Sequence, residues 1–125
     1  MIMKRLVSCL FLLLCAGCTA RAIVTFEQPA IRLMYRCDRE TSETFEVTDE
    51  EMIRDIKDAL ALITIGKQSD IRATDSDDIF TFITKDDSEY TYTFVQLRIV
   101  LDQKRYEISN DQTLWKLAES IRKEG

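Results

Sequence analysis

Apolar residues recur at intervals of three and four between positions 52 and 63, which is the spacing of one face of an α-helix. Thr48 and Glu51 stand at capping-box spacing before this stretch, so their side chains can bond the free N–H groups of a first helical turn. Gly66 follows and can cap the other end. The pattern predicts a helix over about residues 48–65. Its apolar positions are Met52, Ile53, Ile56, Leu60 and Ile63.

A second helical pattern lies near the end of the chain. Ser109 and Gln112 again have capping-box spacing, and a stripe of apolar residues follows them, so we expect a helix over about residues 110–123. The stripe consists of Leu114, Trp115, Leu117, Ala118 and Ile121.

Elsewhere apolar and polar residues alternate, which is typical of a half-buried β-strand. Ile31, Leu33, Tyr35 and Cys37 share one face of such a strand at a period of two, and we expect this face to lie in the core. Shorter strands are expected over residues 44–47, 79–83 and 106–108, with polar turns over residues 85–88 and 102–104.

The longest alternating run, residues 89–101, changes phase partway along. Tyr90, Tyr92 and Phe94 occupy one phase, and the apolar residues from Val95 onward occupy the other. Because a slip of one residue inverts the two faces of a strand, we expect a β-bulge or a strand break at this point. The three aromatic residues are expected in the core, and the alternative is a binding surface.

Strands combined with one central and one terminal helix predict an α+β fold, in which an antiparallel β-sheet packs against two helices. A chain of 125 residues is long enough for one such domain, expected over residues 31–125. Residues 18–30 are expected to form a tether or an edge strand, because Pro29 cannot donate a hydrogen bond to a sheet.

The first residues carry the pattern of an export signal, which implies a signal helix before the domain. Lys4 and Arg5 form a short basic region, an apolar run follows over residues 6–15, and Ala16 and Gly17 are the small residues expected before a processing site. The apolar run is too short for a membrane-spanning helix, which needs about 20 residues.

The segment Leu14-Cys15-Ala16-Gly17-Cys18 resembles the bacterial lipobox, although Cys15 stands where that motif prefers Leu. The resemblance implies that residues 1–17 are a lipoprotein signal peptide. It also implies that Cys18 is the site of lipid attachment and that the protein is anchored outside the cytoplasm to the bacterial cell membrane. The alternative is ordinary signal peptidase cleavage after Ala20 or Ala22, which would release a soluble protein.

The whole layout is similar to small lipoproteins of Gram-positive bacteria whose domains have no assigned function. The resemblance rests on the lipobox and on the order of the elements, and it implies no catalytic residues.

The charge balance argues against nucleic acid as a partner. The chain has 17 Lys and Arg against 22 Asp and Glu, a net charge of −5, whereas binding to phosphates needs a basic face. The chain contains no His, which removes the usual general base and the commonest transition-metal ligand.

The acidic run Asp75-Ser76-Asp77-Asp78 has the composition of a calcium loop but not its spacing. Asp86 and Asp87 lie about 20 Å away at the far end of a strand. We expect a solvated loop and no metal or cofactor.

Catalytic patterns are equally incomplete. Ser120 and Lys123 match S-x-x-K without the motifs that accompany it in enzymes, and nothing local brings Glu46 and Glu107 together. No catalytic residue is predicted. Cys37, the one cysteine left after lipidation, is expected to be a buried apolar residue, and the alternative is a redox-active or dimer-forming thiol.

Together these patterns predict a lipid-anchored, non-enzymatic binding or interaction module whose partner is a protein or a small molecule. The alternative is a secreted soluble enzyme or enzyme inhibitor.

Overall fold

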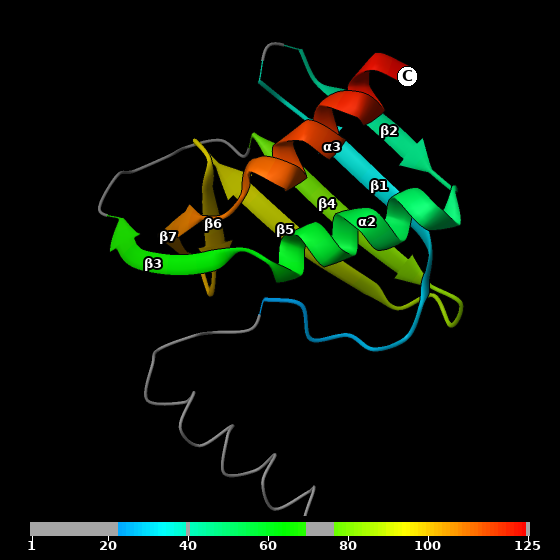
Figure 1. Ribbon diagram of the computed structural model, residues 1–125, viewed down its shortest axis with the longest axis horizontal. Helices are drawn as coiled ribbons and strands as arrows, with labels where there is room; N and C mark the ends of the chain where they lie inside the picture. Colours follow the sequence, from blue (N-terminus) through cyan, green and yellow to red (C-terminus); the bar gives the residue numbers. More distant parts are fainter. Residues whose placement is uncertain (1–22, 40, 70–76, 125) are drawn as a thin grey trace, which may run out of the picture.

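The computed structural model of the protein describes residues 23–39, 41–69 and 77–124. Over these residues the chain forms a seven-stranded antiparallel sheet, in the order β2-β1-β4-β5-β6-β7-β3, and two helices that cover one face of it (Figure 1). The predicted α+β fold, an antiparallel sheet packed against two helices, is confirmed. The strands are β1 (Ala30–Cys37), β2 (Glu43–Val47), β3 (Thr64–Ser69), β4 (Asp78–Thr84), β5 (Glu89–Val95), β6 (Arg98–Leu101) and β7 (Lys104–Ser109), and the helices are α2 (Glu50–Ala61) and α3 (Gln112–Glu124).

Helix α2 connects β2 to β3 in the sequence. β2 and β3 are the two edge strands of the sheet, so α2 crosses the sheet between its edges (Figure 1). The N-terminus of α2 therefore lies beside the β2 edge.

The buried face of β1 differs from the prediction at one residue. Leu33 and Tyr35 are fully buried and Cys37 is 7% exposed, but Ile31 is 51% exposed. The pairing of β1 with β4 shifts register between Ala30 and Arg32. A bulge at this point adds one residue to β1, so Ile31 leaves the phase of the other three side chains.

Helix α2 starts later and ends earlier than the sequence suggests. Its N-cap is Asp49 rather than Thr48, because an Asp49 carboxylate oxygen accepts the hydrogen bond from the Met52 backbone N–H. The helix ends at Ala61 with Leu62 as its C-cap, so the expected cap at Gly66 is wrong.

Gly66 lies in β3, a strand that the sequence does not predict. The β-branched residues Thr64 and Ile65 pair there with Ser109 and Ile108 of β7. A Cβ atom at position 66 would lie 3.2 Å from the carbonyl oxygen of Glu107, so glycine allows the close approach of the two strands.

The phase change in the long alternating run is a strand break, as expected. Strand β5 ends at Val95, and Gln96 and Leu97 form a tight turn with φ values of 50° and 60° before β6 begins. Asp102 and Gln103 turn the chain again, with φ values of 51° and 67°. The two expected polar turns join β4 to β5 and β6 to β7, so β4, β5, β6 and β7 form an antiparallel meander.

Helix α3 confirms the predicted apolar stripe but not the predicted capping box. Leu114, Ala118 and Ile121 are buried, while Ser109 is the last residue of β7 and Gln112 begins the helix. The Asp111 carbonyl oxygen accepts from the Trp115 N–H at 3.3 Å, and the Asp111 carboxylate accepts from the indole Nε1–H at 2.6 Å.

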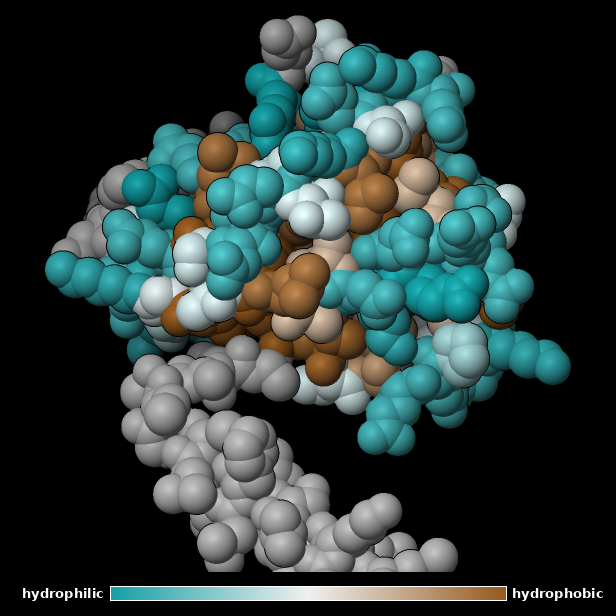
Figure 2. Space-filling view, viewed as in Figure 1, coloured by the Kyte–Doolittle hydropathy of each residue, from teal (hydrophilic) through white to brown (hydrophobic). Residues whose placement is uncertain are grey.

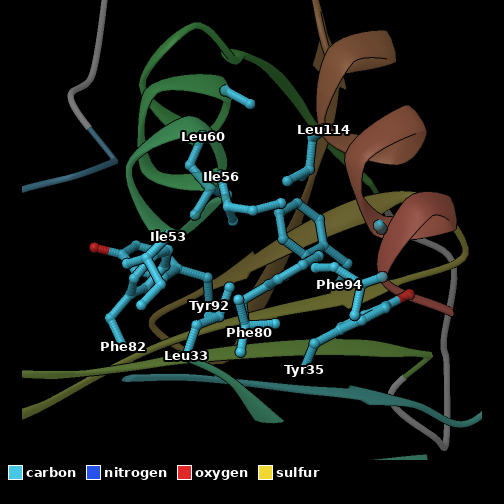
Figure 3. Packing of buried hydrophobic residues seen from close by; sticks show 14 of the residues in the cluster. Leu33, Tyr35, Ile53, Ile56, Leu60, Phe80, Phe82, Tyr92, Phe94 and Leu114 are labelled. Atoms are coloured by element: carbon cyan, nitrogen blue, oxygen red, sulfur yellow. The ribbon is translucent and has the colours of Figure 1, made fainter. Parts of the chain in front are cut away.

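The core lies between the helices and the sheet and is rich in aromatic rings (Figure 3). Tyr35 stacks on Phe80 at a centroid distance of 4.6 Å, and Phe94 meets Trp115 edge-on at 5.1 Å. Tyr92 and Phe94 are buried, and the half-buried Tyr90 packs against the same cluster, which confirms that the three aromatic residues of β5 belong to the core.

Residues 23–29 have no regular structure, but two of their side chains reach the core. Ile23 and Phe26 are buried. The Phe26 ring stacks on Tyr90 at a centroid distance of 4.5 Å and meets Phe82 in a tilted arrangement at 5.3 Å. None of the helices in the described part of the chain is long and apolar enough to cross a membrane.

Candidate functional site

An open groove runs along the edge strand β2, between the first turn of α2 and the last turns of α3. Its volume is about 670 Å³. It forms because α2 begins beside one end of β2, while α3 passes over the sheet and ends nearby (Figure 1). The residues that line it are Glu43, Thr44, Phe45, Glu46, Val47, Thr48, Asp49, Met52, Ile121 and Glu124.

The middle of the groove is apolar. Phe45 and Val47 lie on the face of β2 that points to the helices, because they pair with the buried residues Tyr35 and Leu33 of β1. Met52 of α2 and Ile121 of α3 approach from the helices. Apolar surface remains visible between hydrophilic side chains on the helix-covered side of the molecule (Figure 2).

The rim of the groove is acidic. Glu43, Glu46, Asp49 and Glu124 are exposed, and the residues that line the groove include no Lys or Arg. Glu43 pairs with Cys37 of β1 and shares the helix-facing side of β2 with Phe45, whereas Glu46 points to the opposite face. Carboxylates therefore lie on both sides of the strand edge.

The outer edge of β2 is free of a neighbouring strand among the described residues, since β1 is its one partner in the sheet. In an antiparallel pair every second residue directs its backbone N–H and C=O toward its partner strand, and the others direct theirs outward. Strand β2 therefore offers backbone donors and acceptors along the groove.

A smaller hollow of about 340 Å³ adjoins the groove and shares Glu43 with it. Its other lining residues are Cys37, Arg39, Thr41 and Arg122. Thr41 donates its hydroxyl to the Glu43 carboxylate at 3.1 Å.

A hydrogen-bond network around the buried residues Tyr35 and Asp78 lies behind this hollow. The Tyr35 hydroxyl donates to Oδ1 of the fully buried Asp78 at 2.6 Å and accepts from Nη1 of Arg122 at 2.7 Å. Arg39 donates to Oδ2 of Asp78 from Nη2 at 2.9 Å and from Nε at 3.2 Å. Its guanidinium also lies over the Trp115 ring, 5.4 Å from the centroid.

The surroundings of Tyr35 stabilise its protonated form. Burial raises the pKa of the hydroxyl well above its ordinary value, and the hydrogen bond to Asp78 raises it further. The phenol therefore stays protonated at neutral pH and acts as a hydrogen-bond donor. Because Tyr35, Asp78 and Arg122 belong to β1, β4 and α3, the network fastens the end of α3 to the sheet.

The predicted burial of Cys37 is confirmed, since the residue is free and 7% exposed. It lines the hollow beside Arg39 and Arg122.

The acidic run is not the solvated loop that we expected. Asp78 begins β4 and is fully buried by its contacts with Tyr35 and Arg39. Asp77 accepts from the Gln96 backbone N–H at 2.7 Å and so holds the β5–β6 turn. Asp75 and Ser76 lie outside the described residues.

Asp86 serves the β4–β5 turn, where it accepts hydrogen bonds from the Thr84 hydroxyl and the Ser88 backbone N–H. These bonds hold the pKa of the Asp86 carboxyl below its ordinary value. Within residues 23–39, 41–69 and 77–124, no group of three or more His, Cys, Asp or Glu side chains could hold a metal ion.

The remaining candidate residues lie apart. Glu46 on β2 and Glu107 on β7 are separated by four strands, about 24 Å along the sheet. In α3, Lys123 forms an ion pair with Glu119 at 3.3 Å. The expected lipid site, Cys18, lies outside the described residues.

Sequence reasoning missed both the groove and the network behind the hollow. Arg39 and Asp78 meet because β1 pairs with β4 in a register that places Cys37 opposite Asp78. The one signal in the sequence was an aspartate directly before a strand of strong β-formers. Local patterns hold no information on the hydrogen-bond partner of this aspartate, Tyr35, which lies 43 residues away in the sequence.

No family model matches the chain, and neither a curated protein nor a solved structure matches it significantly.

Proposed function

We propose that the protein is a lipid-anchored extracytoplasmic module that binds a partner in the β2 groove and performs no catalysis. The observation that carries the proposal is the groove itself, which combines apolar surface with an unpaired strand edge. Domains that bind extended segments commonly use this combination, because the edge supplies hydrogen bonds and the apolar surface supplies contact area.

Several side chains that could take part in catalysis serve the fold instead, and this favours binding over catalysis. Tyr35 and both carboxylate oxygens of Asp78 hold the fold together, and Cys37 is buried. A catalytic site needs a nucleophile, a base and a group that orients the base, each within hydrogen-bond distance of the next. The groove instead offers carboxylates, backbone groups and apolar side chains.

The spacing between Cys18 and the folded domain supports a position close to the membrane. Cys18 stands five residues before Ile23, whose side chain is buried in the core. Five extended residues span at most about 18 Å. An acylated Cys18 would therefore hold the domain within that distance of the membrane surface.

Metabolic labelling with an alkyne fatty acid tests the anchor. We expect label on the wild-type protein and none on Cys18→Ser, while Cys9→Ala, which changes a cysteine inside the signal, keeps its label. Retention of label by Cys18→Ser, or its absence from the wild type, contradicts the anchor.

Mass spectrometry of the mature N-terminus separates the proposal from the alternative of a secreted soluble enzyme or inhibitor. The proposal requires an acylated Cys18 as the first residue. An unmodified N-terminus at Arg21 or Ile23 would support the secreted alternative.

A further inference from the structure

We propose that the β2 groove takes an extended, positively charged segment of a partner protein, which adds to the sheet as a new strand beside β2. This inference rests on the proposed binding function and names the class of partner. It follows from the backbone geometry of the edge, the apolar floor and the sign of the charge at the rim.

The edge has the size and shape that strand addition needs. Strand β2 is five residues long, and β1 pairs with it over its whole length, from Leu33 opposite Val47 to Cys37 opposite Glu43. A new strand would lie about 4.8 Å from β2 on its other side. Its backbone would satisfy the outward N–H and C=O groups of β2.

The floor of the groove would take every second side chain of the added strand. Side chains of one strand point alternately to the two faces of a sheet, so those on the helix side would meet Phe45, Met52 and Ile121. Phe45 and Met52 are half-buried and already pack against the core, so an apolar side chain would continue an existing cluster. We therefore expect small or branched apolar residues at alternate positions of the partner segment.

The acidic rim of the groove indicates that the partner segment is positively charged. The carboxylates of Glu43 and Glu46 lie on opposite faces of the strand edge, and those of Asp49 and Glu124 lie on the helix side. The carbonyl end of α3 adds partial negative charge near Glu124. Of the basic residues of that last turn, Lys123 pairs with Glu119, and Arg122 is directed to the Tyr35 hydroxyl and lines the smaller hollow rather than the groove.

The same charges disfavour a second copy of this chain as the occupant. Two β2 edges joined across a two-fold axis would bring Glu43 and Glu46 of one copy close to those of the other, and like charges across a strand pair are destabilising. A segment with Lys or Arg between apolar residues would remove this repulsion and gain attraction.

The test uses the full chain in neutral detergent and a fluorescent seven-residue peptide in which Lys alternates with Val and Ile in the middle and also occupies both ends, so that Lys lies on both faces of the added strand. Fluorescence anisotropy measures the dissociation constant at low salt. We expect saturable binding that weakens as the salt concentration rises. We also expect no binding of a peptide with Glu in place of Lys, and loss of binding when alternate backbone amides of the probe are N-methylated.

The variant Glu43→Lys with Glu46→Lys should weaken binding about tenfold, because it reverses the charge on both sides of the edge. The matched control is Glu89→Lys with Glu107→Lys, which changes the net charge equally on exposed residues of β5 and β7, away from the groove. The control should bind the probe like the wild type. Urea unfolding of both variants checks that they fold.

Three outcomes would overturn the inference. If the wild type does not bind the probe, the edge carboxylates act only against self-association. If both double variants lose equal affinity, the probe senses net charge and not the groove. If the N-methylated probe binds as well as the unmodified one, no strand is added. Loss of fatty-acid labelling together with normal probe binding would contradict the anchor and leave this inference intact.

Discussion

The Tyr35 hydroxyl and the Asp78 carboxylate, 43 residues apart in the sequence, meet at 2.6 Å in the buried end of the sheet. Their bond links β1 to β4, and the Arg122 donation to the same hydroxyl adds α3. The phenol oxygen therefore adds to the buried side chains of α3 that hold this helix, and with it one wall of the β2 groove, over the sheet.

Replacing Tyr35 with Phe should destabilise the domain by about 1–3 kcal/mol, because Oδ1 of the buried Asp78 loses its donor and Arg122 loses its acceptor. Equilibrium unfolding in urea measures this change. Thr91→Val is a suitable control, since Thr91 is exposed and its hydroxyl bonds the Thr81 hydroxyl at 3.2 Å, away from the network. We expect the control to change stability by less than about 0.5 kcal/mol. Equal stability of Tyr35→Phe and the wild type would show that the network contributes nothing to the fold.

The domain should lose stability in alkali. The pKa of Tyr35 is raised in the folded protein by burial and by Asp78, and burial also raises the pKa of Tyr92. Above a pH of about 10 the unfolded chain releases these protons while the folded protein keeps them, so stability falls as the pH rises. The contribution is fully present below that pH.

Urea unfolding between pH 8 and pH 11 measures this effect. The wild type should lose more stability over this range than Tyr35→Phe, which cannot release a proton at that position. Parallel pH profiles for the two proteins would contradict the raised pKa of Tyr35. Absorbance at 295 nm offers a second measurement, since the tyrosinate signal of Tyr35 should appear only on unfolding.

The thiol of Cys37 should react with Ellman's reagent at least about tenfold more slowly in the folded protein than in denaturant, because the residue is 7% exposed. Cys37→Ala supplies the background from other thiols. Replacement by Ser should cost about 1–3 kcal/mol if no partner accepts the new hydroxyl. Rapid reaction of the folded protein would instead favour a functional thiol at the hollow beside Arg39 and Arg122.

Phe26→Ala should destabilise the domain by about 3–5 kcal/mol, since the residue is 6% exposed and its ring packs against Tyr90 and Phe82. It should also remove the cation–π contact of Lys57, whose Nζ lies 4.2 Å from the ring centroid. The neighbouring exposed residue gives the control, Glu27→Ala, which should be close to neutral. Urea unfolding compares the two, and a mild effect of Phe26→Ala would mean that the segment before β1 adds little to the core.

The errors in the sequence-based prediction fall where a distant partner competes with a local pattern. Ile63 continues the helical spacing, but Thr64 and Ile65 are held in a strand by β7, more than 40 residues further along the chain. Ile31 continues the strand alternation, but the register of β1 against β4 places a bulge beside it. Each residue follows a valid local rule, and the pairing of the sheet overrides it.

The candidate site was less predictable than the fold. No local pattern links Glu46 to another carboxylate, but in the structure it lies on the rim of a groove with Glu43, Asp49 and Glu124. Those four side chains come from a strand, a helix cap and the end of a second helix. Their common location depends on where α3 ends over the sheet, which no interval in the sequence encodes.

The sequence by itself determined the α+β class, the turns between β4 and β5 and between β6 and β7, the apolar stripe of α3 and an interruption of the strand pattern near Val95. These features arise from contacts and turns between residues close in the chain, so composition and spacing are enough to predict them. Tertiary structure alone decided the order of the seven strands, the edge position of β2 and the burial of Asp78. The physical reason is that a buried carboxylate is stable only beside its donors, and Tyr35 and Arg39 reach Asp78 only after β1 and β4 have paired.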